Sequence, residues 1–208
     1  MGQVELENNI TKEYKNHKDN FINNPKCRLI NPTKQELGKV SKKILEAINA
    51  RVKELTKLEQ WKNTGDATTW FTNRKQKHCR NFIQFDIDGF YPAITAELLE
   101  EALAWAGTIV EISEDERKII FQRKKLILFK GNQAWSKKGQ DFFDVTMGSY
   151  DGAEVCELVG LFLLHRLREN KVEDVGLYRD DGAAALKLTP ARWNKQRKQS
   201  AECLPNTT

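Results

Sequence analysis

The chain has 208 residues, of which 39% are hydrophobic and 30% are charged, and its formal net charge is +5. This composition is typical of a globular protein with one sizeable core, and no apolar run approaches the roughly 20 residues that a membrane-spanning helix requires. The four cysteines include no CxxC pair, which argues against a zinc site and favours reduced thiols in an intracellular protein.

The charge is distributed unevenly along the chain. Residues 1–80 carry 17 basic and 9 acidic side chains, residues 81–186 carry 12 and 19, and residues 187–208 carry 5 and 1. A basic front and a basic tail around an acidic centre fit a protein that holds a polyanion close to a bound cation. Ordinary solvated surface charge explains the same pattern equally well, so both interpretations stay open on charge alone.

The first 80 residues predict one strand and one long helix. The segment CRLI at 27–30 is a candidate strand, and Thr33 with Glu36 forms a capping box that begins a helix. We expect this helix to end near residues 61–65 and residues 66–73 to form a short helix or a turn. Its apolar positions, spaced by three and four residues, are Leu37, Val40, Ile44, Ile48, Val52 and Leu55.

The middle of the chain predicts a strand followed by two helices. The segment NFIQFD has the apolar content of a strand and ends at Asp86. One helix is expected to begin after Thr95 and to run through Ala106. The capping box of Ser113 and Glu116 predicts a second helix over EDERKIIFQRKKLILF. The polar stretch after it is expected to be a loop with a short hairpin.

The last third of the chain predicts a buried helix and a hairpin. In VGLYRDDGAAALKL, apolar segments flank Asp-Asp-Gly, which predicts a β-hairpin with the acids at its turn. Residues 189–208 are polar, basic and without pattern, so we expect a disordered tail. The apolar face expected for the helix over YDGAEVCELVGLFLLHRLREN consists of Val155, Leu158, Val159, Phe162 and Leu163.

Three short motifs stand out when they are taken together. Asp86 ends a strand and Tyr91 follows five residues later, TMGSYDG opens an apolar helix, and the hairpin presents Tyr178-x-Asp180-Asp181. Each motif alone is weak, because aspartate and glycine are the residues that tight turns prefer. Two adjacent carboxylates repel each other, however, and a bound cation removes that repulsion.

In this order and spacing, the motifs resemble motifs A, B and C of the reverse transcriptases: FDIDGFYPAI, TMGSYDGAEV and YRDD. The upstream HKDNFINNPKCRLINPTKQELGKVSK resembles their finger segment, and the resemblance covers roughly residues 12–188. It implies an α+β polymerase palm, an antiparallel sheet with packed helices, with partial fingers and no thumb. The implied domains are partial fingers at 1–80, a palm with the three motifs at 81–188, and a basic tail at 189–208.

The resemblance implies the core of a retroelement RNA-directed DNA polymerase that works by a two-metal mechanism. Its partners are an RNA template with a DNA primer and deoxynucleoside triphosphates, and its cofactor is a pair of Mg²⁺ ions, for which Mn²⁺ can substitute. Mg²⁺ prefers carboxylate oxygens, which agrees with the acidic motifs. The implied principal metal ligands are Asp86 and Asp180. Asp181 assists them, and the backbone carbonyl of Ile87 matches a further ligand.

Four other residues match substrate-binding positions of the family. Tyr91 matches the aromatic gate that excludes a ribose 2′-hydroxyl, although a core tyrosine beside a proline explains it structurally. Arg28 matches the finger arginine that pairs with triphosphate oxygens, a task that suits guanidinium geometry. Lys18 is a second phosphate contact or a solvated lysine. Tyr178 is expected near the primer terminus.

Motif B departs from the family pattern. Gly148 and Ser149 fall where the family's loop touches the incoming base and the template. Many relatives have glutamine where this chain has Met147, and Ser-Pro where it has Gly152 and Ala153. This departure leaves the template contact without a clear counterpart.

Only 27 residues follow the last motif, and they show neither the family's motif D lysine nor a helical thumb. A non-catalytic, truncated remnant with weak nucleic-acid binding is therefore the alternative to an active polymerase core, and we expect the chain by itself to extend primers poorly. A family B DNA polymerase is disfavoured because its motif C acids are not adjacent. An RNA-templated RNA polymerase is disfavoured by Tyr91, because that class usually has a smaller or polar residue there.

Overall fold

The computed structural model describes residues 11–14, 27–30, 36–58, 60–125, 128–130, 133–135, 142–170, 172 and 174–186. Residues 11–14, 27–30, 128–130 and 133–135 are described by their backbone alone. The helices are α1 (Glu36–Thr56), α2 (Thr64–Thr72), the 3₁₀ helix η1 (Lys77–Cys79), α3 (Phe90–Ala93), α4 (Ala96–Gly107), α5 (Glu114–Lys124) and α6 (Gly152–Glu169). The strands are β1 (Thr11–Tyr14), β2 (Cys27–Ile30), β3 (Asn81–Asp86), β4 (Leu128–Lys130), β5 (Gln133–Trp135), β6 (Val175–Tyr178) and β7 (Asp181–Leu186).

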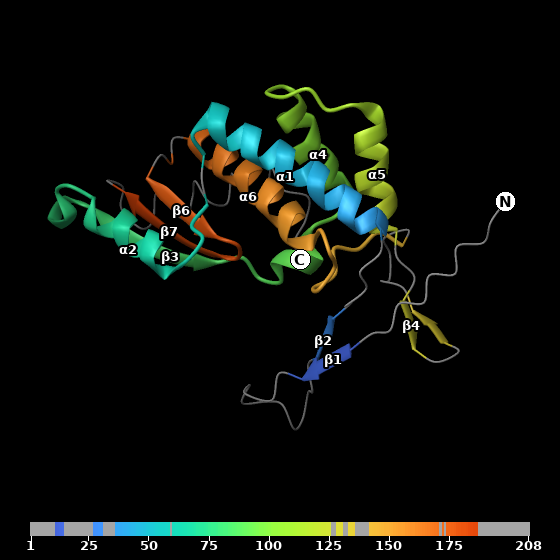
Figure 1. Ribbon diagram of the computed structural model, residues 1–208. Coiled ribbons are helices and arrows are strands. Elements are labelled where there is room, and N and C mark those ends of the chain that lie inside the picture. Colours follow the sequence, from blue (N-terminus) through green and yellow to red (C-terminus); the bar gives the residue numbers. More distant parts are fainter. Residues whose placement is uncertain are drawn as a thin grey trace.

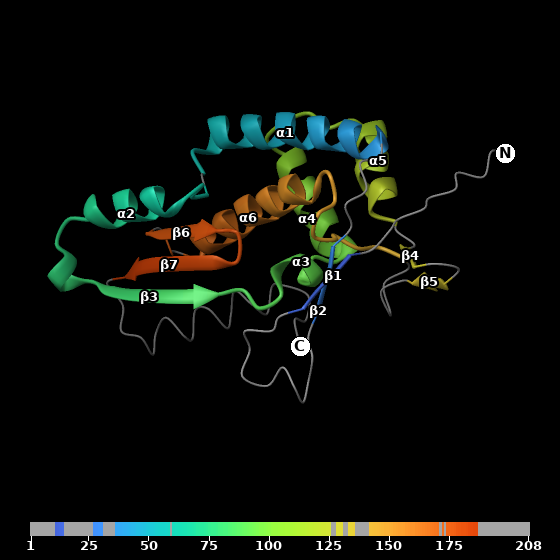
Figure 2. The same ribbon diagram turned by 60° about the horizontal axis from the view of Figure 1, so that its bottom comes forward.

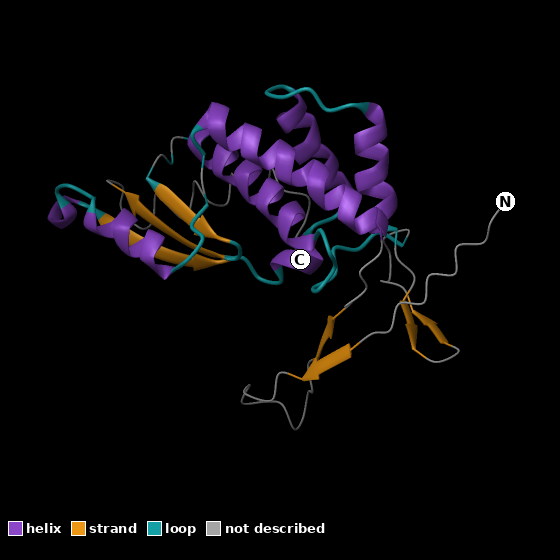
Figure 3. Ribbon diagram, in the orientation of Figure 1, coloured by secondary structure: helices purple, strands orange, loops and turns teal. Residues whose placement is uncertain are grey.

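The fold is α+β, with one three-stranded antiparallel sheet of order β3-β7-β6 beside a group of helices. Figures 1 and 3 show α1, α4, α5 and α6 gathered on one side of this sheet. Figure 2 shows α2 alongside the sheet, toward the end at which β3 begins. The pairs β1–β2 and β4–β5 form separate two-stranded ribbons, so the expected strand at 27–30 and the short hairpin are both confirmed. No helix in the described ranges is long and apolar enough to cross a membrane.

Helix α6 is the centre of the main hydrophobic core. Its apolar side chains are buried on nearly all sides, because α1 and α4 pack on it and β6 covers part of it. A helix that is apolar all round belongs in the interior of a protein. The predicted helix is therefore confirmed, but its buried surface is wider than the single face expected from periodicity: Leu161 and Leu164 are buried as well.

Helix α1 is confirmed, but its predicted apolar face is partly wrong. Leu37, Val40 and Leu55 are exposed, while the polar Ser41 and Asn49 are buried. The two polar side chains reach α6 and the residue before it. The Ser41 hydroxyl donates to the Asp151 carboxylate at 2.6 Å, and the Asn49 amide donates to the Glu154 carbonyl at 2.9 Å. Hydrogen bonding to α6, which periodicity does not show, rotates the buried face.

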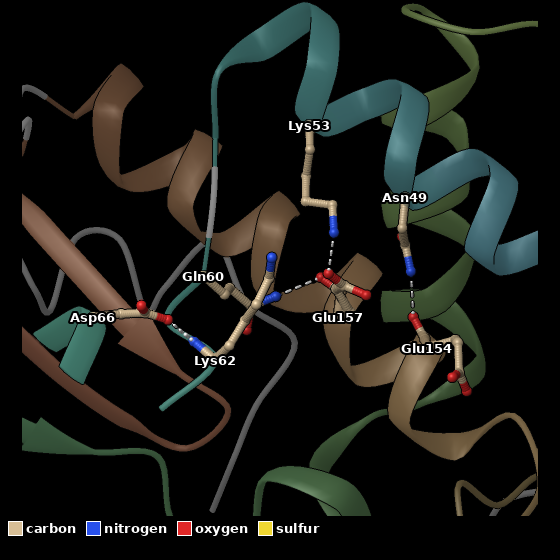
Figure 4. Close-up of polar contacts among 7 residues, drawn as sticks. All are labelled: Asn49, Lys53, Gln60, Lys62, Asp66, Glu154 and Glu157. Carbon is tan, nitrogen blue, oxygen red and sulfur yellow. Dashed lines mark hydrogen bonds and ion pairs between the residues drawn. The ribbon is translucent and has the colours of Figure 1, made fainter. Parts of the chain in front are cut away.

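The segment after α1 is tied to α6 rather than continuing the helix. Lys53 forms an ion pair with Glu157 at 2.6 Å, and the Gln60 amide donates to the Glu157 carbonyl at 2.7 Å (Figure 4). Lys57 adopts a positive φ of 56°, which ends the helix at Thr56 instead of at residues 61–65.

Helix α5 begins at the predicted capping box but ends at Lys124, and residues 128–130 belong to a strand. Lys124 is fully buried, and its ammonium donates to Asp151 at 2.7 Å. The Ser41 hydroxyl holds the other carboxylate oxygen of Asp151. This buried contact joins α1, α5 and the start of α6, and it fixes where α5 ends. Burial lowers the pKa of Lys124, and Asp151 opposes that shift.

Replacing Asp151 with alanine is expected to lower the free energy of unfolding by about 3–5 kcal/mol, because it leaves a buried ammonium without its counter-charge. Urea unfolding measures this change. The matched control is Asp115→Ala, which breaks the exposed pair with Lys118. The control should leave the unfolding midpoint nearly unchanged. Equal, small effects of both substitutions would contradict the importance given to the buried pair.

Candidate active site

The predicted acids meet at one end of the three-stranded sheet. Asp86 is the last residue of β3 and lies directly opposite Asp181, the first residue of β7. Asp180 precedes it in the turn, and its carbonyl accepts a hydrogen bond from the Ile87 N–H at 2.8 Å. One strand pairing therefore places Asp86 beside the hairpin that carries Asp180 and Asp181. All three aspartates are exposed.

The hairpin turn differs in detail from the prediction. Tyr178 pairs with Asp181, so the two-residue loop is Arg179–Asp180 and only one of the acids lies in it. Arg179 has a φ of +54°, whereas Asp180 is not among the described residues with positive φ. A positive φ at the first loop position alone is the signature of a type II′ turn, where glycine is usual. An arginine there is strained, and such strain is often found at functional sites.

Gly182, which suggested the turn from the sequence, lies in β7. It pairs with Phe85, and a β-carbon at Gly182 would collide with the Phe85 ring. The glycine therefore allows an aromatic ring to cross the strand on the side that packs against the core. Side chains alternate between the two faces of a strand. Asp86 follows Phe85 and Asp181 precedes Gly182, so both acids face solvent on the opposite side of the sheet.

Mg²⁺ prefers carboxylate oxygens as ligands, and three carboxylates lie at this end of the sheet. Asp86, Asp180 and Asp181 form no ion pair or side-chain hydrogen bond with another described residue, so their charge is not neutralised within that part of the chain. In the described ranges, no three His, Cys, Asp or Glu side chains are gathered closely enough to hold a metal ion. The backbone thus brings the donors together, while the exposed side chains would still have to rotate to converge on an ion.

Tyr91 lies on the one-turn helix α3, close to this acidic end. Burial and, to a smaller extent, the neighbouring Cys156 on α6 raise its pKa to about 12. Burial also raises the pKa of Cys156 to about 12. Arg179 and Asp180 are near enough to influence both groups electrostatically. The structure therefore joins α3, α6 and the hairpin at Tyr91. No sequence pattern indicated Cys156, because it is a lone cysteine in an apolar helix.

The Gly148–Ser149 loop, which was matched to motif B from the sequence, is a tight turn that precedes α6. Gly148 has a φ of +82°, a conformation that favours glycine, and the Ser149 N–H donates to the Thr146 carbonyl. The Ser149 hydroxyl is buried close to Gly152 and has no hydrogen-bond partner within the described residues. Gly148 is exposed, so the backbone rather than the serine hydroxyl is the part of the loop that a ligand can reach.

The side chains of the two candidate phosphate contacts lie outside the part of the chain that the structure describes. Arg28 is placed only by its backbone, in β2 opposite Glu13. Lys18 lies outside the described residues. Neither can be related to the acids, so both remain predictions from the sequence.

An aromatic groove of about 810 Å³ opens beside the acids, between α2 and the sheet. No prediction from the sequence included this groove. Aromatic residues in TTWF followed by the basic run RKQKHCR were the available signal, because aromatic rings next to cations are typical of nucleic-acid surfaces. The side chains that define the groove are Trp61, Trp70, Phe71, Phe82, Tyr178 and Asp181.

The fold is similar to those of known polymerases. One is apo telomerase from Candida tropicalis, truncated from its C-terminal domain, with a TM-score of 0.60 and 13% identity over 93% of this chain. Another is an insertion-loop deletion mutant of the RNA-dependent RNA polymerase of a human picobirnavirus, with a TM-score of 0.53 and 12% identity over 93% of this chain. This chain spans 46% and 39% of those two chains. No family model and no curated protein matches the sequence. At these identities, the likeness shows a polymerase-like fold.

The half-buried Tyr91 and the buried Cys156 predict that the folded chain loses stability in alkali. Both groups have pKa values raised to about 12, from ordinary values of 10.0 and 9.0. The folded chain keeps two protons that the unfolded chain releases, so their stabilising effect is complete below pH 9 and is lost as the pH rises toward 12.

Urea unfolding between pH 8 and pH 11 measures this loss. The Cys156→Ala variant should show a shallower decline than the unmodified chain, and adding Tyr91→Phe should flatten it further. An unchanged pH dependence in the double variant would show that other groups cause the decline.

Proposed function

We propose that the chain is the catalytic core of a reverse-transcriptase-type polymerase, which adds deoxynucleotides to a DNA primer on an RNA template. The observation that carries the proposal is the strand register that sets Asp86 opposite Asp181 and beside Asp180 in the turn. The polymerase-like fold supports it independently of the sequence motifs. The sheet with its hairpin corresponds to a palm in this interpretation, and the segment before it to partial fingers.

The proposed metal ligands are the carboxylates of Asp86 and Asp180, assisted by Asp181 and by the carbonyl of Ile87. When bound, a pair of Mg²⁺ ions supplies activation of the primer 3′-oxygen and charge neutralisation on the triphosphate. The chain's own part is to hold the carboxylates on adjacent strands, so that only side-chain rotation is needed. Exposure of all three acids leaves them accessible to the substrate.

Tyr91 is proposed to select the sugar of the incoming nucleotide. Its ring packs against the main core, and burial, with a smaller effect of Asp180 in the turn, raises the pKa of its hydroxyl. A ring fixed at that position leaves little room for a 2′-hydroxyl. Arg28 and Lys18 are proposed to contact the triphosphate, Tyr178 the primer terminus, and the Gly148–Ser149 loop the template and base.

A second candidate function is non-catalytic nucleic-acid binding. It is favoured by one observation: within the described ranges, the acids are not gathered into a three-ligand cluster. A chain of this kind would retain the fold and its basic segments, and would bind RNA or DNA through phosphate contacts without adding nucleotides.

Single-nucleotide addition decides between the two functions. A hairpin oligonucleotide that contains both an RNA template and a DNA primer end removes the need to assemble two strands, so weak activity can be detected. The unmodified chain is expected to add a labelled deoxynucleotide in Mg²⁺, and Asp180→Asn is expected to lower the rate by about a hundred- to a thousandfold, as loss of an essential electrostatic group does in other enzymes.

Asp88→Asn is the matched control, because it removes an exposed carboxylate two residues from Asp86. It should retain most of the activity. If the unmodified chain adds no nucleotide in either Mg²⁺ or Mn²⁺, the catalytic proposal fails and the non-catalytic candidate is favoured.

The proposed gate predicts that Tyr91→Ala admits ribonucleotides. The ratio of kcat/KM for deoxynucleotide over ribonucleotide should fall at least tenfold in this variant, because the ring that meets the 2′-hydroxyl is gone. Tyr91→Phe is the control that removes the hydroxyl but keeps the ring, and it should preserve the ratio. Equal sugar selectivity in all three chains would remove Tyr91 from this role.

A further inference from the structure

The face of the sheet that carries the acids is only partly covered. Asp86 and Asp181 share this face with Gln84 and Ala183, because alternate residues of paired strands point the same way. Phe85 and its neighbours on the other face pack into the core. The groove lies along the face that carries the acids and extends from Asp181 toward α2.

Exposed aromatic side chains line the groove away from the acids. Phe71 on α2 is 45% exposed and Phe82 on β3 is 40% exposed, and their ring centroids lie 5.0 Å apart. Trp61 and Trp70 form an edge-to-face pair at 5.2 Å beside them. A cluster of four aromatic rings that stays partly exposed in the folded chain is characteristic of a surface that binds a partner.

The groove is built from fixed parts. The backbone N–H of Trp61 donates to the Leu177 carbonyl at 2.8 Å. The Trp61 ring lies so close to Gly176 that no β-carbon would fit there. Asn63 caps the start of α2. These contacts hold α2 against the sheet. The indole N–H of Trp70 is buried and finds no acceptor among the described residues.

Basic residues follow the aromatic ones directly. Arg74 stacks on the Trp70 ring with 4.8 Å to its centroid and pairs with Asp174 at 2.9 Å. Lys77 lies over the Phe71 ring at 5.2 Å. Lys75 is exposed and forms no ion pair with another described residue. Aromatic faces with cations at their edges match the alternation of bases and phosphates in a nucleic-acid strand.

We propose that this aromatic groove binds an unpaired stretch of single-stranded nucleic acid, whose bases stack on Phe71 and Phe82 and whose phosphates meet Lys75 and Lys77. This inference rests on the proposed polymerase function, because the groove extends to Asp181 and Tyr178, two residues of the proposed polymerase site. Its ligand is unpaired because stacking on protein rings requires base faces that a continuous duplex keeps covered.

Binding of a fluorescent 12-nucleotide oligo(dT) or oligo(rU) to the full-length Asp180→Asn chain tests the groove without any catalytic step. The double substitution Phe71→Ala and Phe82→Thr should weaken binding at least about fivefold, since stacking contributes about that much or more for each base. Alanine suits a helix and threonine a strand, so both elements should persist. Urea unfolding checks that the fold is retained.

Phe142→Ser is the matched control, because Phe142 is 51% exposed and does not line the groove. It should leave the affinity unchanged. Lys75→Gln should instead reduce the dependence of affinity on salt concentration, by about one unit or less in the logarithmic slope. The aromatic variant should keep the slope of the unmodified chain, because its phosphate contacts remain.

Several results would overturn the inference. These are no measurable binding, equal binding by the aromatic variant and the unmodified chain, and tighter binding of a blunt duplex than of the single strand. The two proposals fail separately. If the chain adds nucleotides but its binding does not depend on Phe71 and Phe82, the proposed polymerase function is supported and the proposed groove is contradicted. If binding depends on these two residues but no nucleotide is added, the groove is supported and the polymerase function is contradicted.

Discussion

The antiparallel register between β3 and β7 is the constraint on which the proposed site depends. It sets Asp86 opposite Asp181, and the hydrogen bond from the Ile87 N–H to the Asp180 carbonyl continues the ladder by one step past the strand. A slip of one residue would move Asp86 to the face that packs on the core, because the side-chain period of a strand is two. The position of every acid in the site therefore follows from one pairing.

The two faces of the three-stranded sheet lie in different environments. Its inner face buries Leu177 and Ala184 and supports Phe85 against the core, where apolar contact contributes most of the stability. Its outer face carries exposed carboxylates that form no ion pair with other described residues. Solvent screens their mutual repulsion, so the fold can keep three negative charges together without burying any of them.

A buried polar junction joins α1, α5 and the start of α6. Asp151 receives hydrogen bonds from Ser41 and Lys124, and it lies between the Gly148–Ser149 loop and α6. Arg123 is buried in the same region, and its guanidinium nitrogens have no hydrogen-bond partner among the described residues. Burial lowers the pKa of Arg123, and Asp151 opposes that shift. The loop before α6 is thus positioned by charges contributed from α5 and a hydroxyl from α1.

The sequence by itself determined the elements that have strong local signals. The caps at Thr95 and Ser113, the strand that ends at Asp86 and the hairpin around Asp180 all follow from short-range preferences of the backbone and of polar side chains. The motifs also predicted that Asp86, Asp180 and Asp181 belong together.

Only the tertiary structure decided which surfaces are buried and which residues meet. Ser41 and Asn49 replaced Leu37 and Val40 on the inner face of α1, because their hydrogen-bond partners lie on or next to α6, more than 100 positions away in the chain. The proximity of Tyr91 to Cys156 and the aromatic groove under α2 arise in the same way. Local patterns describe one element at a time, whereas packing satisfies polar groups and apolar faces between elements that the sequence does not place side by side.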